Sequence, residues 1–381
     1  MNILYVLNSG NPGGMEQHVL DLVRGMIDLG NTVYVWCPQG DFMPQFEEAG
    51  ALVSLKKIGF DVDPKYIVEL SRFIKSKNID LVHSHELKAG VNAMISGKIA
   101  GVPVVTHTHT PILEWQIPLV KKRLNTFLYS FFVNHFSAVE IALTESRKRA
   151  KIMEGIREFK LKIIPNAVKI DDINLSQETR IKRREEILKK YNIPLDSYVF
   201  GFISRISVEK GHKTLVEAYK KVKETLSSRG IVDKTFLFIG GGGDLEAGIK
   251  SQIADLGLGQ CTLITGRFSA EDKPKFYSSL DSFIFPTLAE GFGIVLIEAM
   301  ANSLPVICSD LEVLQEVGGS AVRYFETANS DDLAEKMVDM YVRADQYKDL
   351  ATQGFERVKD LYSMESFVQK YYALYLEVLN R

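Results

Sequence analysis

The sequence predicts an α/β fold made of two successive domains, each built around a parallel sheet. Short apolar runs of strand length alternate with amphipathic stretches of helix length, which is typical of parallel α/β sheets. This alternation begins at Ile3–Leu7 and restarts at Tyr198–Ser204. A chain of 381 residues is long enough for two domains of ordinary size.

The first domain is expected over residues 1–170. Its opening strand, Ile3–Leu7, leads into Gly13-Gly14, and an amphipathic helix follows over Glu16–Leu29. Each short apolar run beyond this helix, bounded by polar or turn residues, predicts a buried strand. These runs are Thr32–Cys37, Leu52–Leu55, Asp80–His83, Val102–Thr106, Ala138–Leu143 and Lys162–Ile164.

The second domain is expected over residues 176–361, after a linker near 167–176. It opens with the charged stretch Ser176–Lys190, which predicts a solvated helix. A further helix is expected over Lys213–Ser227, and the last residues, 362–381, predict an amphipathic, aromatic helix with no strand after it. The expected strands are Tyr198–Ser204, Thr235–Ile239, Cys261–Thr265, Ser282–Phe285 and Val306–Cys308.

The composition is that of a soluble globular protein, with 46% hydrophobic and 25% charged residues. A net charge of −2 gives no general attraction for nucleic acid, so no nucleic-acid partner is expected. Cys37, Cys261 and Cys308 form no Cys-x-x-Cys pair, which predicts free thiols in a reducing cytoplasm. The N-terminus predicts a strand rather than a secretion signal, and no apolar run reaches the roughly 18 residues that span a bilayer.

The strongest functional signal lies between the strand Ser282–Phe285 and a helix that starts near Ile294. The connecting loop ends in Gly291, Phe292 and Gly293. In open α/β sheets, ligands bind where strands end and helices start. Because glycines let backbone N–H groups approach a phosphate at a helix N-terminus, a phosphate-bearing ligand is expected at this loop.

Two carboxylates, Glu290 and Glu298, frame this glycine turn. The neighbours of Glu298 in the expected helix are nearly all apolar, and a carboxylate there is costly unless its oxygens find hydrogen-bond donors. The vicinal hydroxyls of a ribose would supply such donors. The alternative is a salt-bridged glutamate of the core, which the presence of both carboxylates around one turn makes less favoured.

A second signal is a pair of cations, Arg205 and Lys210, in the loop after the strand Tyr198–Ser204. Arginine offers a planar fork of donors and lysine a compact charge, and both suit a diphosphate. Alone, such charges are more often ordinary loop residues. Because this loop and the glycine loop follow strands of the same expected sheet, we expect them to share one rim.

The start of the first helix is a third signal. Gly13, Gly14 and Glu16 follow the first strand, and the helix N-terminus there is expected to favour phosphates. A plain turn accounts for a Gly-Gly pair equally well.

Histidines also follow two strands of the first domain, His83 and His85 after one and His107 and His109 after the next. Two histidines two residues apart suggest a metal. No cysteine or carboxylate lies close in sequence to complete a ligand set for His107 and His109, so no metal is expected. A single histidine directed at the ligand is favoured instead, with His83 and His85 as weaker candidates.

Two other motifs are discounted. Asp61-Val-Asp63 imitates an Asp-x-Asp metal motif but falls in a loop without supporting partners. Gly240–Gly243 follows a strand but lacks the full spacing of a dinucleotide fingerprint, and a flexible turn is favoured.

The stretch Leu119–Phe136 combines Lys121, Lys122 and Arg123 with apolar and aromatic residues. A basic, aromatic, amphipathic helix can lie on an anionic lipid surface, so peripheral contact with the inner face of a membrane through 119–136 is one expectation. A core helix with a solvated basic end is the equal alternative.

These residues resemble those of the retaining glycosyltransferases of family four, which have the GT-B architecture of two Rossmann-like domains with a cleft between them. The resemblance covers nearly the whole chain. Its most specific part is the Glu-x7-Glu element formed by Glu290 and Glu298 with Gly-Phe-Gly between them. Arg205 and Lys210, and the Gly-Gly-x-Glu turn at 13–16, agree in order and spacing.

The resemblance implies how the donor would be held. Glu290 would contact the donor sugar and Glu298 the ribose hydroxyls, while the diphosphate would lie against Arg205 and Lys210. The donor-binding residues implied are Gly13, Gly14, Glu16, Gly291, Phe292, Gly293, Ile294 and Glu298, and the catalytic residues are His109, Arg205, Lys210 and Glu290.

The resemblance also assigns the acceptor side to the first domain, with the helix at 362–381 crossing back to pack on it. His109, six residues after Pro103, matches the family's cleft histidine better than His107 does. One departure is the shortened segment Glu316–Gly319, which leaves the identity of the donor open.

The activity implied is a cytoplasmic hexosyltransferase that moves a sugar from a UDP- or GDP-linked donor to a glycan or lipid-linked acceptor in bacterial surface polysaccharide synthesis. Cations and loop amides would stabilise the leaving diphosphate, so no metal or other cofactor is expected. Retention without a placed nucleophile implies attack from the same face, with the leaving phosphate taking the proton. A nucleotide-sugar epimerase or hydrolase, and a non-catalytic nucleotide-sugar sensor, are the alternatives.

Overall fold

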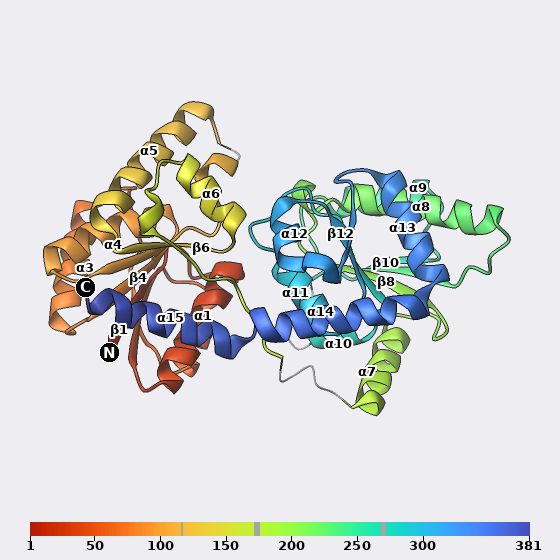
Figure 1. Ribbon diagram of the computed structural model, residues 1–381, viewed down its shortest axis with the longest axis horizontal. Helices are drawn as coiled ribbons and strands as arrows, with labels where there is room; N and C mark the ends of the chain where they lie inside the picture. The colour runs from red at the N-terminus through yellow and green to blue at the C-terminus, as the bar shows by residue number, and fades with distance from the viewer. Residues whose placement is uncertain (116, 171–175, 268–271) are drawn as a thin grey trace. The chain divides into compact units, whose positions relative to one another are not determined.

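The computed structural model describes residues 1–115, 117–170, 176–267 and 272–381. The chain divides into two compact units, Met1–Asn166 with Met364–Arg381, and Ala167–Ser363 (Figure 1). The linker expected near 167–176 lies partly outside the described residues. Among the described helices, none combines the length and the apolar character that crossing a membrane requires.

The described part of the first unit holds a parallel sheet of seven strands in the order β3-β2-β1-β4-β5-β6-β7. Every strand expected in this half is present, with ends that differ by a residue or two. Most of them are buried on both faces and therefore have continuous apolar runs, whereas Leu52–Leu55 is partly exposed. The strands are β1 (Asn2–Val6), β2 (Thr32–Cys37), β3 (Leu52–Leu55), β4 (Leu81–His85), β5 (Val104–His107), β6 (Val139–Ala142) and β7 (Leu161–Ile163).

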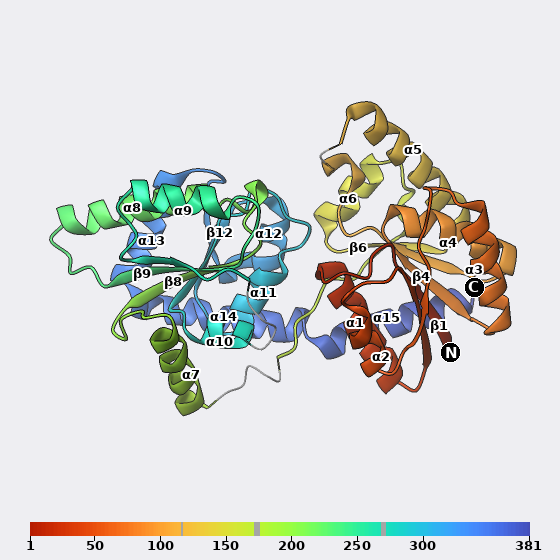
Figure 2. The ribbon, with the colours of Figure 1, turned by 180° about the vertical axis from the view of Figure 1, so that it is seen from behind.

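Helices cover this sheet, and α15, the last helix of the chain, packs against α1 (Figure 2). The hydroxyl of Tyr375 in α15 lies 3.2 Å from that of Tyr5 in the sheet, and both side chains are buried. Asp63, discounted above as a metal ligand, caps α3 by accepting a hydrogen bond from Tyr66 N at 3.1 Å. The helices are α1 (Gly14–Asp28), α2 (Met43–Glu48), α3 (Pro64–Ser76), α4 (Leu87–Ala100), α5 (Leu119–Phe136), α6 (Glu145–Met153) and α15 (Met364–Leu379).

The second unit has, in its described residues, a parallel sheet of six strands in the order β10-β9-β8-β11-β12-β13. Only β13 was not expected, because it is three residues long and contains an exposed arginine, Arg323. The strands are β8 (Tyr198–Ile203), β9 (Thr235–Gly240), β10 (Thr262–Ile264), β11 (Ser282–Phe285), β12 (Val306–Ser309) and β13 (Arg323–Phe325).

The helices of the second unit include the charged helix expected after the linker, which is capped by Ser176 through a hydrogen bond from Thr179 N at 3.2 Å. Short 3₁₀ turns lie at Ile112–Glu114 and Glu158–Lys160 in the first unit, and at Val208–Lys210, Gly319–Ala321 and Ala344–Tyr347 in the second. The helices are α7 (Gln177–Lys190), α8 (His212–Ser228), α9 (Glu246–Asp255), α10 (Asp272–Ser278), α11 (Ile294–Ala301), α12 (Glu312–Gly318), α13 (Ser330–Val342) and α14 (Lys348–Leu361).

Both sheets reverse their strand order at one point. In the first unit β1 lies between β2 and β4, and in the second β8 lies between β9 and β11. Ligands of open α/β sheets bind at the carboxyl ends of the strands at this reversal. The loops after β1, β4, β8 and β11 are therefore where the fold provides for a ligand.

Candidate functional site

The two charged loops of the second unit lie side by side because β8 and β11 are neighbouring strands. The loop after β8 carries Arg205 and Lys210, and the loop after β11 carries Glu290. The hydroxyl of Thr287 donates to the carbonyl oxygen of Glu209 at 2.9 Å and ties the loops together. The structure thus brings these residues to one rim of the sheet.

Two glycines in the left-handed region shape these loops. Gly211 has a φ of +69°, and a Cβ there would lie 1.9 Å from the carbonyl oxygen of Pro286. Gly293 precedes α11 with a φ of +93°, and a Cβ there would lie 2.8 Å from Leu314 Cδ2. Since glycine has no side chain that could cap α11, the first N–H groups of this helix suit an anionic ligand.

Lys210 and Glu290 form an ion pair, a contact that the sequence analysis did not expect. Lys210 Nζ lies 2.7 Å from Glu290 Oε2, and the two side chains are 21% and 17% exposed. Arg205 contacts Glu209 at 3.1 Å and is 73% exposed. The cation assigned to the diphosphate and the carboxylate assigned to the sugar are therefore neighbours.

Glu298 is also paired, within the second unit. It accepts hydrogen bonds from Lys273 Nζ at 2.5 Å and from the Tyr277 hydroxyl at 2.8 Å. This is the salt-bridged arrangement that the sequence analysis weighed against ribose binding. Burial and the Glu298 carboxylate hold the pKa of Tyr277 well above its ordinary value. Sequence reasoning missed both partners, although their spacing of four residues places them on one helix face.

The other residues of the glycine loop differ in exposure. Phe292 is 2% exposed, and its ring packs on Tyr362 with centroids 5.7 Å apart. Its side chain is thus part of the core. Gly291 N donates to Glu290 Oε1 at 3.3 Å, and Ile294 is the first residue of α11.

In the first unit, Gly13 and Gly14 are exposed at the start of α1, whereas Glu16 is buried. A Cβ on Gly13 would lie 2.6 Å from Glu16 Oε2, so this carboxylate folds back over the first turn. The helix dipole stabilises a carboxylate that lies near the helix N-terminus.

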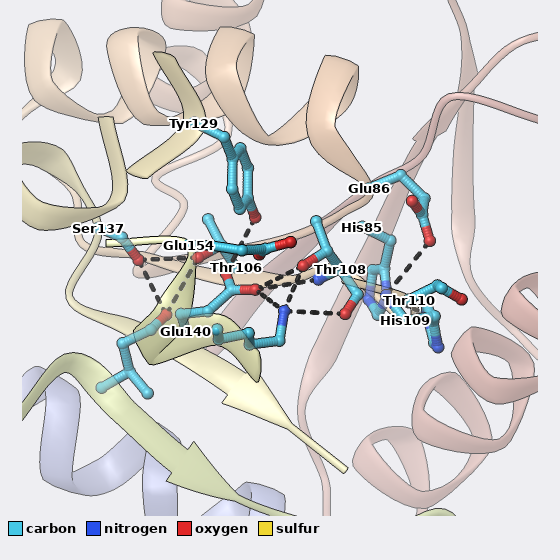
Figure 3. Close-up of polar contacts among 12 residues, drawn as sticks. His85, Glu86, Thr106, Thr108, His109, Thr110, Tyr129, Ser137, Glu140 and Glu154 are labelled. Carbon is cyan, nitrogen blue, oxygen red and sulfur yellow. Dashed lines mark hydrogen bonds and ion pairs between the residues drawn. The ribbon is translucent and has the colours of Figure 1, made fainter. Parts of the chain in front are cut away.

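His109 follows β5, which pairs with β4 on one side of the reversal of the first sheet. Its backbone N–H donates to Glu86 Oε1 at 3.3 Å, and its Nε2 lies 3.3 Å from Nδ1 of His85 (Figure 3). Burial, with the charges of neighbouring histidines and Lys151, holds the pKa of His109 well below its ordinary value. The imidazole is therefore neutral near pH 7 and can exchange hydrogen bonds with a hydroxyl group.

Glu86, which sequence reasoning missed, precedes α4 with a φ of +70°. A non-glycine residue in this region stores backbone strain, which is frequent at functional sites. Burial raises the pKa of the Glu86 carboxyl to about 7.

A buried ionic network lies beside His109. Lys151 Nζ contacts Glu140 Oε1 at 2.5 Å, and the two side chains are 1% and 0% exposed. The hydroxyls of Tyr129 and Thr108 donate to the same carboxylate at 2.9 and 2.8 Å (Figure 3). The network thereby holds the residue that precedes His109. A glutamate within the apolar run Ala138–Leu143 was the available signal.

Comparisons with known proteins cover both units. A model described as Glycosyltransferase Family 4 matches residues 12–172, and one described as Glycosyl transferases group 1 matches residues 183–357. The chain is similar to the UDP-Gal:alpha-D-GlcNAc-diphosphoundecaprenol alpha-1,3-galactosyltransferase of Escherichia coli, with 26% identity over 263 residues, 67% of this chain and 64% of that one. It thus spans just under two thirds of that relative.

Two further similarities extend over nearly the full length. The capsular polysaccharide biosynthesis glycosyltransferase CapM of Staphylococcus aureus is 24% identical over 372 residues, 93% of each chain. The crystal structure of Anabaena HepE in complex with UDP and glucose superposes with a TM-score of 0.84 at 20% identity, over 98% of this chain and 99% of that one. At this identity the likeness concerns the fold.

Proposed function

We propose that this chain, a glycosyltransferase with the GT-B fold, transfers a hexosyl group from a UDP- or GDP-linked sugar with retention of the anomeric configuration. It belongs to the glycosyltransferases that the Family 4 and group 1 models describe. The acceptor is a glycan or a lipid-linked sugar of a bacterial surface polysaccharide. The observation that carries the proposal is the Lys210–Glu290 pair beside the glycine turn, at the strand-order reversal of the second sheet.

The partly exposed ion pair supports a donor diphosphate at this rim. When the sugar leaves, negative charge grows on the diphosphate, and Lys210, Arg205 and the N-terminus of α11 stabilise it there. Because the pair is not fully buried, Lys210 exchanges Glu290 for phosphate oxygens at a modest cost. Glu290 is then released to accept hydrogen bonds from the hydroxyls of the sugar.

Glu298 is proposed to bind the ribose. Lys273 and Tyr277 fix the orientation of its carboxylate, and they also neutralise much of the cost of burying it. A carboxylate has about four acceptor positions, so it can bind ribose hydroxyls while keeping both of these donors.

The first unit is proposed to hold the acceptor, with His109 in contact with the transferred sugar. In the transfer step the bond between the anomeric carbon and the phosphate oxygen breaks, and the acceptor oxygen bonds to the same face of that carbon. The proton of the acceptor passes to the leaving phosphate. Neutral His109 donates or accepts a hydrogen bond and takes no net charge.

A released-nucleotide assay tests the proposal. The purified chain is incubated with a panel of UDP- and GDP-sugars, each with and without lipid-linked acceptors. A transferase releases nucleotide only with an acceptor and yields a product with the donor's anomeric configuration. Nucleotide release without acceptor would identify a hydrolase, a changed donor sugar an epimerase, and binding without turnover a sensor.

Helix α5 supports peripheral binding to a membrane that carries the acceptor. Leu119, Val120 and Phe127 are 61%, 82% and 67% exposed, and the exposed cations Lys121 and Arg123 lie on the same helix. Each cation adds about 1 kcal/mol of attraction to an anionic surface. Co-sedimentation with phosphatidylglycerol vesicles at low salt is expected, with phosphatidylcholine vesicles as the control. No binding to the anionic vesicles contradicts the membrane role.

A further inference from the structure

Four buried histidines cluster in the first unit, next to His109. His83 and His85 come from β4, His107 from β5 and His18 from α1. The ring centroid of His18 lies 5.1 Å from that of His107 and 5.6 Å from that of His85. We call His18, His85 and His107 the histidine triad. The proposed sugar transfer does not use these three histidines.

The ring nitrogens of the triad lie close enough together to suggest a metal site. One ring nitrogen from each histidine lies within 4.8 Å of the other two. Around a tetrahedral zinc ion with bonds of about 2.0–2.1 Å, the nitrogens are roughly 3.3 Å apart. The three rings would therefore have to move closer together to bind one ion.

The hydrogen bonding of His18 indicates which of its ring nitrogens can bind an ion. Its Nδ1 lies 2.9 Å from the amide oxygen of Asn166, which can only accept, so Nδ1 carries the proton. The Nε2 atom is then the unprotonated nitrogen, and it lies 3.4 Å from the hydroxyl of Tyr371, a hydrogen bond that a bound ion would replace. Metal-binding histidines almost always donate their second N–H to such an oxygen, which fixes the tautomer and the ring.

The other two rings have nitrogens without a partner. Within the described parts of the chain, neither nitrogen of His107 and not Nε2 of His85 is hydrogen-bonded, although all are buried. An unsatisfied buried polar atom costs about 1–3 kcal/mol, so stacking of the rings alone leaves this arrangement unexplained.

We propose that His18, His85 and His107 bind one divalent transition-metal ion of the zinc class, which stabilises the first unit. Three neutral imidazoles suit zinc, cobalt, nickel or copper, whereas magnesium prefers oxygen ligands. The sequence analysis expected no metal here because His107 and His109 lack a third ligand nearby in sequence. The folded chain supplies it from α1 and β4.

The ion is distinct from the donor chemistry, which the second unit carries. It also acts on His109 through His85. If the ion takes Nε2 of His85, then Nδ1 of that ring carries the proton and donates it to Nε2 of His109, at 3.3 Å. This fixes which nitrogen of His109 is protonated.

Metal titration of the full chain tests the proposal. The protein is stripped with a chelator and titrated with Co²⁺, and the visible absorption of four- or five-coordinate cobalt is recorded. We expect saturation at one equivalent per chain, displacement by Zn²⁺, and no response to Mg²⁺. A wild-type protein that binds neither Co²⁺ nor Zn²⁺ stoichiometrically overturns the site.

Variants locate the ion. His107→Gln is expected to abolish stoichiometric binding, and Asn166→Ala to weaken Zn²⁺ affinity about 10–100-fold. His135→Gln is the matched control, because His135 is exposed on α5. Unchanged Co²⁺ spectra in both test variants contradict the assignment, and Asn166→Ala decides if His107→Gln does not fold. Binding of free UDP or GDP reports on the second unit. If the wild-type chain bound neither nucleotide, that result would count against the proposed donor site and not against the histidine triad.

Discussion

The two units hold their central ion pairs in opposite ways. In the first, Glu140 and Lys151 are 0% and 1% exposed, whereas in the second Glu290 and Lys210 are 17% and 21% exposed. A fully buried charge that loses its partner is neither paired nor hydrated, which is strongly unfavourable, so we expect such a pair to stay together. A partly exposed charge can exchange its partner for a ligand. We interpret the first pair as the support of His109 and the second as part of the donor site.

The largest expected effect is on the stability of the first unit. Glu140→Gln leaves Lys151 buried without a counter-ion, which we expect to cost about 3–5 kcal/mol in urea denaturation. Glu69→Gln is the control, because the Lys56–Glu69 pair is 46% and 33% exposed. That change is expected to cost less than about 1 kcal/mol. Equal losses in the two variants would remove the distinction between the pairs.

The next effect is catalytic and belongs to the second unit. Lys210→Ala removes a charge that acts on the leaving diphosphate, so kcat should fall about a hundredfold, or roughly 3 kcal/mol. Lys213→Ala, a neighbouring lysine that is 78% exposed, should retain kcat. Steady-state kinetics measure both. If Lys210→Ala and Arg205→Ala each kept wild-type kcat and donor KM, the diphosphate would lie elsewhere.

A smaller effect separates the two carboxylates of the glycine loop. Glu298→Ala should raise donor KM and weaken binding of free UDP or GDP by about 10–100-fold, since a hydrogen bond to a charged group is worth about 1.5–3 kcal/mol. Glu290→Ala should impair turnover of the donor but leave nucleotide binding nearly intact. Calorimetry with free nucleotide measures the difference, and the reverse pattern would exchange the two roles.

The smallest expected effect is that of added metal on turnover. Because Arg205 and Lys210 neutralise the diphosphate, Mg²⁺ or Mn²⁺ should not raise kcat, and a short exposure to EDTA should not lower it. The proposed ion in the histidine triad is buried, so a short exposure to EDTA is not expected to remove it. Activity that EDTA abolishes and Mg²⁺ restores would argue against a donor site built on these two cations.

Much of the fold could be predicted because its signals are local. Short apolar runs identified every strand of the described residues except β13, whose exposed Arg323 interrupts the pattern. Gly293 could be assigned to the loop between a strand and a helix because glycine tolerates the backbone conformations that such loops need. Phe292 was expected at the donor, but its side chain is buried against Tyr362, since periodicity does not distinguish a core ring from a ligand contact.

The sequence by itself determined the α/β class, the order of the elements and the strand ends at which the candidate residues stand, because hydrophobic periodicity depends on near neighbours. Only the tertiary structure decided which charges meet. Lys210 and Glu290 are 80 residues apart in sequence, and Glu298 finds Lys273 at a distance of 25. The histidine triad is drawn from α1, β4 and β5. Parallel strand order alone brings such distant residues together, and no local pattern encodes it.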